Sequence, residues 1–86
     1  MQIETTRKFD KQFRKLPTKI QKEFAKRIDL FLTERNHALL HTHKLSGNLR
    51  GLWSFNVTAD VRVVFDDSYE DVVILVAVAS HIELYG

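Results

Sequence analysis

Residues 43–66 read HKLSGNLRGLWSFNVTADVRVVFD, and the second half of this stretch carries the clearest structural pattern in the chain. Its apolar residues recur at every second position on both sides of Thr58 and Ala59, with Trp53, Phe55 and Val57 before them and Val61, Val63 and Phe65 after them. A period of two is typical of strands that bury one face. The pattern therefore predicts a β-hairpin with its tip at Thr58 and Ala59, and with Trp53 in the core.

A third strand is predicted at Val72–Ala79, an apolar run of eight residues that is rich in β-branched side chains. Such a run is typical of a strand that is buried on both faces. With an acidic turn at Asp66–Asp71 before it, the last three strands form an antiparallel meander. In that register Asp60 and Arg62 lie beside the end of the last strand, near His81. We therefore expect an acid, a base and a histidine to converge at one end of the sheet.

Two helices are predicted before this sheet. Phe9, Phe13 and Leu16 follow a helical period, and after Pro17 a second apolar stripe continues to about Arg35 through Ile20, Phe24, Ile28, Phe31 and Leu32. Thr18 and Gln21 fit a capping box at the start of the second helix. The short connection predicts an antiparallel helical hairpin.

The remaining segments complete a single α+β domain over residues 1–86. Gln2–Thr5 alternates weakly, which predicts a short edge strand. Asn36–Asn48 shows no period and is expected to be a loop, although it holds three of the four histidines. The predicted order is β-α-α-β-β-β, with the helical hairpin packed on a small antiparallel sheet.

The composition narrows the class of protein. The chain has 86 residues and no cysteine, which excludes a disulfide scaffold, a thiolate metal site and a cysteine nucleophile. Its longest apolar run is far shorter than the roughly 20 residues that a membrane helix needs. The N-terminus is polar from Gln2 onward, unlike a secretory signal. We expect a cytoplasmic domain that does not enter a membrane.

The formal net charge of +2 conceals a polarised chain. Residues 1–50 have a balance of +7 and residues 51–86 a balance of −5, with Arg62 as the only Lys or Arg of the second segment. A basic excess confined to one segment is the usual sign of a polyanion partner, of which nucleic acid is the commonest. A solvated helical face explains this charge pattern equally well.

Together these features resemble the RelE/ParE superfamily of bacterial toxins from toxin–antitoxin pairs. The resemblance rests on the element order, on FRKLP at the helical bend, on residues 43–66 and on the closing ASHIELYG. The nearest branch is YafQ-like, which carries H-x-L-x-G before the second strand, an Asp entering the third strand, and H-x-x-L-[FY]-G at the end. The chain departs from that branch at Asn56, where a second histidine is usual, and at Val76–Val78, where an arginine is usual.

The resemblance implies a toxin that enters the A site of the 30S ribosomal subunit and cleaves messenger RNA without a metal or other cofactor. Its partners would be mRNA, ribosomal RNA and an antitoxin that holds it silent in a hetero-oligomer. By matching position, His43, Asp60, His81 and Arg62 correspond to the catalytic residues, and Tyr85 stands where an aromatic residue stacks on a base. The other residues assigned to substrate binding are Asn56, Arg50 and Lys44.

These residue types suit the reaction. Cleavage of RNA without metal needs a base for the 2′-hydroxyl proton, a cation for the phosphate charge and an acid for the departing 5′-oxygen. His43 and His81 suit the acid and base roles in either order, because both protonation states of histidine exist near neutral pH. Arg62 would clamp the phosphate with its bidentate fork, and Asp60 would orient a histidine or contribute to proton transfer. Asn56 can bind phosphate or a base edge, but it cannot carry a proton at neutral pH.

The same residues have structural interpretations. His41 and His43 have a spacing that could ligate zinc, but only two or three ligands are in view. Arg62 could form a salt bridge with Asp60 or with a residue of the acidic turn. Tyr85 could serve only to anchor the C-terminus.

Two other functions are compatible with the resemblance. One is a ParE-like protein that inhibits DNA gyrase by binding and cleaves nothing. The other is a degenerate toxin that retains only antitoxin binding. His43, Asp60 and His81 together favour the nuclease, whereas the departures at Asn56 and Val76–Val78 favour the degenerate toxin.

Overall fold

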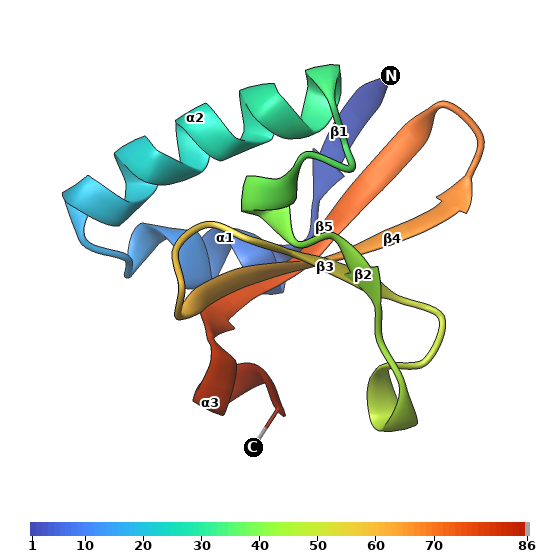
Figure 1. The fold of residues 1–86 in the computed structure, drawn as a ribbon. Helices are drawn as coiled ribbons and strands as arrows, with labels where there is room; N and C mark the ends of the chain where they lie inside the picture. The colour runs from blue at the N-terminus through green and yellow to red at the C-terminus, as the bar shows by residue number, and fades with distance from the viewer. Residues whose placement is uncertain (86) are drawn as a thin grey trace.

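The computed structural model describes residues 1–85, with side chains through Leu84, as helices packed on a sheet (Figure 1). The helices and strands are β1 (Gln2–Thr5), α1 (Arg7–Arg14), α2 (Thr18–Thr33), β2 (His43–Lys44), β3 (Trp53–Asn56), β4 (Val61–Tyr69), β5 (Val72–Ser80) and α3 (His81–Tyr85). Two 3₁₀ turns, η1 (Ala38–Leu40) and η2 (Gly47–Leu49), flank β2. None of the helices within residues 1–85 is long and apolar enough to cross a membrane.

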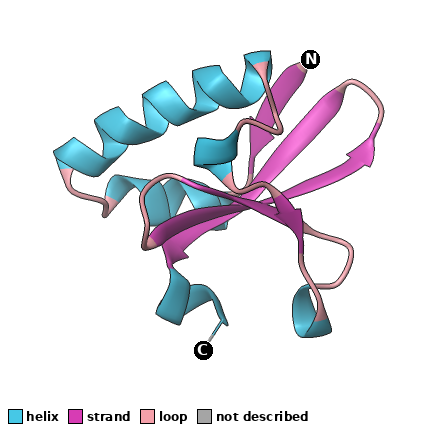
Figure 2. Ribbon diagram, in the orientation of Figure 1, coloured by secondary structure: helices cyan, strands magenta, loops and turns pink. Residues whose placement is uncertain are grey.

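The sheet has five strands within the described residues, in the order β1-β5-β4-β3-β2 (Figure 2). The last three strands form the predicted antiparallel meander, and β2 pairs antiparallel with β3. β1 instead pairs in parallel with β5, from Gln2 opposite Val72 to Thr5 opposite Leu75. The α+β class is confirmed, and the sheet is mixed rather than wholly antiparallel. A four-residue edge strand carries no pattern that could have predicted its direction.

The segment predicted as an acidic turn, Asp66–Asp71, is mostly strand. β4 continues to Tyr69, and the chain turns only at the two residues that follow, the second of which, Asp71, has a φ of 62°. Pairing with β5 holds this end of β4 extended. Asp67 also forms an ion pair with Arg35 at the end of α2, with 2.6 Å between Nη1 and Oδ2. The long-range contacts therefore override the local preference of the acidic residues for a turn.

The predicted loop at Asn36–Asn48 contains the short strand β2. His43 pairs with Ser54 and Lys44 pairs with Trp53 across β3. The prediction of a loop is wrong at these two residues because a two-residue strand is too short to show a period. Its extended form comes from pairing with β3.

The helical hairpin forms as predicted and packs on one face of the sheet. The ring of Phe31 lies 4.9 Å from that of Phe55 and 5.0 Å from that of Phe65, between centroids. The prediction that Leu32 belongs to the apolar stripe is wrong. Its side chain is 47% exposed, and Leu30 packs against the core instead. The buried centre consists of Phe9, Phe31, Leu40, Phe55, Val57, Val63, Phe65, Val73, Leu75 and Val78.

The bend between α1 and α2 does not contain the predicted capping box. Pro17 is the N-cap of α2, Thr18 is the first helical residue, and no side chain caps this end. Gln21 instead contacts the preceding helix, where its Nε2 donates to the carbonyls of Phe13 and Leu16. Carbonyls at the end of a helix have no N–H partner within the helix, so Gln21 closes α1 rather than opening α2.

β5 contains a β-bulge at Val76. Val64 and Phe65 are adjacent on β4 and lie opposite Ala77 and Leu75, respectively. Val76, between these two residues of β5, therefore has no counterpart on β4. An extra residue shifts the alternation of side chains by one position. Val78 therefore joins the core, and Ala77 and Ala79 are buried on the other face of the sheet.

Polar side chains near the N-terminus bond to the backbone at the bulge. The hydroxyl of Thr6 donates to the carbonyl of Val76 at 2.8 Å and accepts the N–H of Phe9 at the start of α1. Oε1 of Gln12 accepts the N–H of Val78 at 2.9 Å. The bulge and α1 therefore stabilise each other.

We expect Gln12→Ala to lower the free energy of unfolding by about 1–3 kcal/mol, because the variant leaves a buried donor, the N–H of Val78, unpaired. Urea unfolding measures this difference. Lys8→Ala, at an exposed position of the same helix, is the control and should change stability by less than about 0.5 kcal/mol. Equal destabilisation of both variants would contradict the role assigned to Gln12.

Candidate functional site

The face of the sheet opposite α1 and α2 carries polar residues of β3 and β4. The alternation that buries Phe55 and Val63 in the core turns Ser54, Asn56 and Arg62 toward this second face. The turn η2 and the helix α3 lie on this side of the molecule (Figure 1). Side chains from β2, β3, β4 and α3 therefore meet here.

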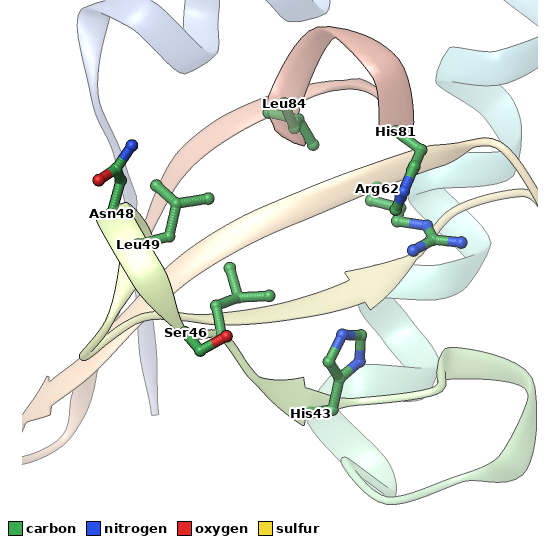
Figure 3. A pocket seen from close by; sticks show the side chains of 8 residues that line it. His43, Ser46, Asn48, Leu49, Arg62, His81 and Leu84 are labelled. Atoms are coloured by element: carbon green, nitrogen blue, oxygen red, sulfur yellow. The ribbon is translucent and has the colours of Figure 1, made fainter. Parts of the chain in front are cut away.

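A cavity of about 370 Å³ opens on this face (Figure 3). Three residues predicted to be catalytic line it together, namely His43, Arg62 and His81. In Figure 3 the side chains of Arg62 and His81 lie on one side of the cavity, and the ring of His43 points toward the same space from β2. The rest of the lining is Leu45, Ser46, Asn48, Leu49 and Leu84. We call this space the reaction cavity.

The orientation of His43 is set by its neighbours. Its Nδ1 lies 2.7 Å from the carbonyl oxygen of His41, and because a carbonyl only accepts, Nδ1 carries a proton. Its Nε2 lies 3.5 Å from the hydroxyl of Ser54, which is fully buried. His41 adopts a left-handed conformation with a φ of 47°, which is uncommon for a residue other than glycine. In the neutral imidazole, Nε2 is therefore the nitrogen that can accept a proton.

Arg62 forms no salt bridge within the described residues, so neither Asp60 nor the acidic segment neutralises it as the structural interpretation proposed. Its Nη2 makes one long hydrogen bond, 3.4 Å, to the carbonyl of Ala59. Its Nε is buried and has no hydrogen-bond partner in the described part of the chain. The guanidinium thus keeps most of its hydrogen-bonding capacity for a bound anion.

His81 is placed by a capping box at the start of α3. The N–H of Ser80 donates to the carboxylate of Glu83 at 3.0 Å, and the N–H of Glu83 donates to the hydroxyl of Ser80 at 3.2 Å. The backbone N–H of His81 donates to the carbonyl of Asp60 at 2.9 Å. These bonds join the end of β5 to the β3–β4 loop and hold His81 at the edge of the reaction cavity.

The capping box also changes the pKa of one of its own residues, Glu83. The hydrogen bond from the backbone N–H of Ser80, and then the contact with its hydroxyl, lower the pKa of Glu83 below its ordinary value. A carboxyl with a lowered pKa contributes stability above its unfolded pKa and loses that contribution as pH falls through its folded pKa. The cap of α3 is therefore complete at neutral pH and weakens in acid.

Asn56 lines a second cavity, of about 400 Å³, with His41, Thr42, His43 and Arg62. His43 and Arg62 line both cavities, so the two spaces adjoin. Like Nε of Arg62, Oδ1 of Asn56 is buried without a hydrogen-bond partner in the described residues.

Lys44 and Arg50, predicted to bind substrate, line neither of these spaces. They lie with Trp53 around a third concavity of about 360 Å³. The ammonium of Lys44 lies 5.4 Å from the centroid of the Trp53 ring, and Trp53 packs against the core as predicted. Successive residues of a strand point to opposite faces, which separates Lys44 from His43.

Asp60 and Tyr85 differ from the other predicted site residues. The side chain of Asp60 is exposed and lines neither the reaction cavity nor the second cavity, although its carbonyl bonds to His81. The side chain of Tyr85 lies outside the described residues. Their catalytic and stacking roles stay predictions.

Sequence reasoning missed Ser54, Ser46 and Asn48. Ser54 shares the face of β3 with Asn56, so the period of two could have identified it. The turn at η2 brings Ser46 and Asn48 to the reaction cavity, and no local sequence pattern predicted this placement. Among residues 1–85, no group of three or more His, Cys, Asp or Glu side chains is arranged to hold a metal ion.

A comparison with models of protein families identifies the family to which this chain belongs. The model of the family described as "Bacterial toxin of type II toxin-antitoxin system, YafQ" matches residues 1–86. The chain belongs to the YafQ family. As a YafQ-family protein it is a toxin of a type II toxin–antitoxin system, and the resemblance to the YafQ-like branch is confirmed.

Solved structures share the YafQ-family fold. YafQ from E. coli strain BL21(DE3) matches with a TM-score of 0.81 at 15% identity, over 98% of this chain and 97% of that chain. YafQ in the E. coli DinJ–YafQ toxin–antitoxin complex matches with a TM-score of 0.78 at 16% identity, over 98% and 96%. The YoeB/ParE toxin from Agrobacterium tumefaciens matches with a TM-score of 0.77 at 18% identity, over 94% and 99%. No curated protein sequence matches.

We expect Ser80→Ala to raise the pKa of Glu83 part of the way back to its ordinary value. The variant removes the hydroxyl but keeps the backbone N–H, which is the larger cause of the shift. The NMR titration of the Glu83 side-chain carboxyl measures the change, with Glu70 on the β4–β5 turn as an internal reference. Identical titrations of Glu83 in both proteins would show that the hydroxyl has no part in the cap.

Proposed function

We propose that this YafQ-family toxin is an endoribonuclease that cleaves messenger RNA by acid/base chemistry. The observation that carries the proposal is the reaction cavity, in which two histidines line one space with an arginine that has no carboxylate partner among the described residues. These groups match the needs of RNA cleavage: a base, an acid and a fixed positive charge.

His43 suits the role of base. Its Nδ1 proton is held by the carbonyl of His41, so the neutral ring presents the lone pair of Nε2. In the proposed step Nε2 takes the proton of the 2′-hydroxyl, and O2′ attacks the phosphorus. The bond from phosphorus to O5′ breaks, and His81 gives a proton to the departing O5′. The products are a 2′,3′-cyclic phosphate and a 5′-hydroxyl end.

Arg62 would stabilise the charge that builds on the phosphate during this step. A guanidinium stays protonated at all relevant pH values and can donate two parallel hydrogen bonds to a phosphate. A paired arginine would first have to leave its carboxylate, and within the described residues Arg62 has none. The side chain of Asp60 is exposed and lines neither cavity, so its part in proton transfer stays a prediction.

The basic hairpin supports a second contact with RNA. Eight Lys and Arg residues of α1, α2 and the bend between them are exposed, namely Arg7, Lys8, Lys11, Arg14, Lys15, Lys19, Lys22 and Lys26. The hairpin and the reaction cavity lie on opposite faces of the sheet (Figure 1). One face can therefore hold mRNA while the other contacts ribosomal RNA, as expected of a toxin that acts in the A site of the 30S subunit in the cytoplasm.

An antitoxin is the proposed protein partner. E. coli YafQ has been crystallised in a complex with DinJ, and this chain shares its fold. An acidic antitoxin segment would neutralise the basic hairpin and silence the toxin. Gyrase inhibition without cleavage, and antitoxin binding alone, are the competing functions, and the departure at Asn56 favours the second of these.

We expect His43→Ala, His81→Ala and Arg62→Lys each to lower the rate of mRNA cleavage by about 10²- to 10⁴-fold. Arg62→Lys keeps the charge but removes the fork. Mapping of mRNA 5′ ends after expression in a bacterial host, and with purified ribosomes, measures the rates. The control is His37→Asn, which keeps an acceptor at the start of η1 and lies outside both cavities.

Three outcomes separate the functions. New 5′ ends that vanish in the three variants support the nuclease. Growth arrest with DNA damage and no new ends would favour gyrase inhibition. Neither effect, with retained antitoxin binding, would favour the degenerate toxin.

We expect binding to ribosomal RNA to weaken with salt, because binding to phosphates releases counterions. In Lys11→Gln/Lys22→Gln, the slope of log affinity against log salt should become shallower by about 0.7–0.9 for each phosphate that the variant no longer neutralises. Filter binding across a salt series measures the slope. Glu70→Gln changes the charge on the distant β4–β5 turn and should leave the slope unchanged; an equal change there would argue against a localised RNA-binding surface.

A further inference from the structure

Two buried polar atoms of the described residues lack hydrogen-bond partners, and they lie together. They are Oδ1 of Asn56 and Nε of Arg62. Asn56 and Arg62 are directly opposite each other on β3 and β4, and both line the second cavity. Folded proteins pair nearly all buried polar atoms, so an unpaired acceptor beside an unpaired donor calls for an explanation.

Two of the surrounding polar groups are occupied elsewhere. The hydroxyl of Thr42 donates to the carbonyl of Arg35 at 2.7 Å, and Nδ1 of His43 donates to the carbonyl of His41. The backbone carbonyl of Asn56 already accepts from Nη1 of Arg27 at 3.3 Å, which fixes the end of β3 against α2. A ligand in the second cavity, which both Asn56 and Arg62 line, would supply the missing partners.

The chemistry of the two atoms restricts that group. Oδ1 only accepts a hydrogen bond and Nε–H only donates one, so the ligand must offer a donor and an acceptor side by side. A phosphodiester group carries no P–OH at neutral pH, so it offers only acceptors and satisfies Arg62 alone. The edge of a nucleobase offers both kinds of group, and Asn and Arg are the side chains that most often read such edges.

We propose that the second cavity binds the base of the nucleotide next to the cleaved bond. Asn56 accepts from an amino or ring N–H group of the base, and Nε of Arg62 donates to a ring nitrogen or carbonyl. The position follows from His43 and Arg62, which line this cavity and the reaction cavity alike. The ring of His41, also in the lining, offers a surface for stacking.

This inference rests on the proposed nuclease function and gives Asn56 a role. At the position where the YafQ-like branch usually has a histidine, this chain has a side chain that cannot transfer protons but can discriminate bases. Asn56 is therefore a specificity-determining residue, and the departure from the family pattern changes which RNA sequence is chosen rather than abolishing turnover.

The test uses the full chain and short 2′-O-methyl oligonucleotides, which cannot be cleaved because they lack the 2′-hydroxyl. The oligonucleotides differ only in the base at one position. NMR follows the Nε–H of Arg62 and the side-chain amide of Asn56 during titration. We expect both signals to shift with oligonucleotide, only that of Arg62 to shift with dimethyl phosphate, a diester without a P–OH group, and affinity to differ by about tenfold or more between the best and the worst base.

Asn56→Leu removes the acceptor at nearly constant volume and should bring the affinities for the different bases to within about twofold of one another. Asn36→Leu, at a position outside both cavities, is the matched control and should keep the preference. A preference retained in Asn56→Leu would overturn the proposal. So would equal responses of both side chains to dimethyl phosphate and oligonucleotide, a test that needs only the wild-type chain.

The two proposals fail separately. Base-dependent binding without any mRNA cleavage would leave the base subsite standing and refute the nuclease. Cleavage without a base preference, and without a shift of the Asn56 amide, would support the nuclease and refute the subsite.

Discussion

The bulge at Val76 is the constraint on which the rest of the structure depends. Without the extra residue, the alternation in β5 would direct Ala77 and Ala79 into the core and Val78 away from it. With it, Val78 packs beneath the helices, and two alanines lie on the opposite face, one of them directly across from Arg62. Thr6 and Gln12 hold the bulge from the side of α1, so the hairpin on one side of the sheet helps to shape the cavity on the other.

The site combines side chains on paired strands with two local hydrogen-bonded motifs. Arg62 projects from a central strand, where pairing on both sides limits its backbone motion. His43 depends on the left-handed turn at His41, which brings a carbonyl to its Nδ1, and His81 depends on the capping box of α3. Each of these motifs involves only two or three residues. With Arg62, they bring side chains from β2, β4 and α3 to the reaction cavity. On the same face, Oδ1 of Asn56 and Nε of Arg62 are buried without a hydrogen-bond partner in the part of the chain that the structure describes.

Much of the fold follows from patterns that the sequence displays openly. Alternation predicted the hairpin at Thr58 and Ala59, because one-sided burial imposes a period of two over several residues. The direction of β1 and the existence of β2 were not predictable, since both are fixed by partners distant in sequence. The two capping-box patterns make the same point: Ser80 with Glu83 forms one, whereas Thr18 with Gln21 does not, because the Gln21 side chain donates instead to the carbonyls of Phe13 and Leu16.

The sequence by itself determined the class of fold, the chemistry available to it and the residues able to perform that chemistry, because residue types and short periods are local properties. It placed Arg62 and His81 near each other through a strand register that the pattern already implied. Only the tertiary structure decided that His43 joins them, that Asp60 bonds through its backbone rather than lining the cavity, and that Lys44 and Arg50 belong to a different surface. The reason is that a cavity is made where segments far apart in the chain meet, and the direction of each side chain there depends on the pairing of its strand.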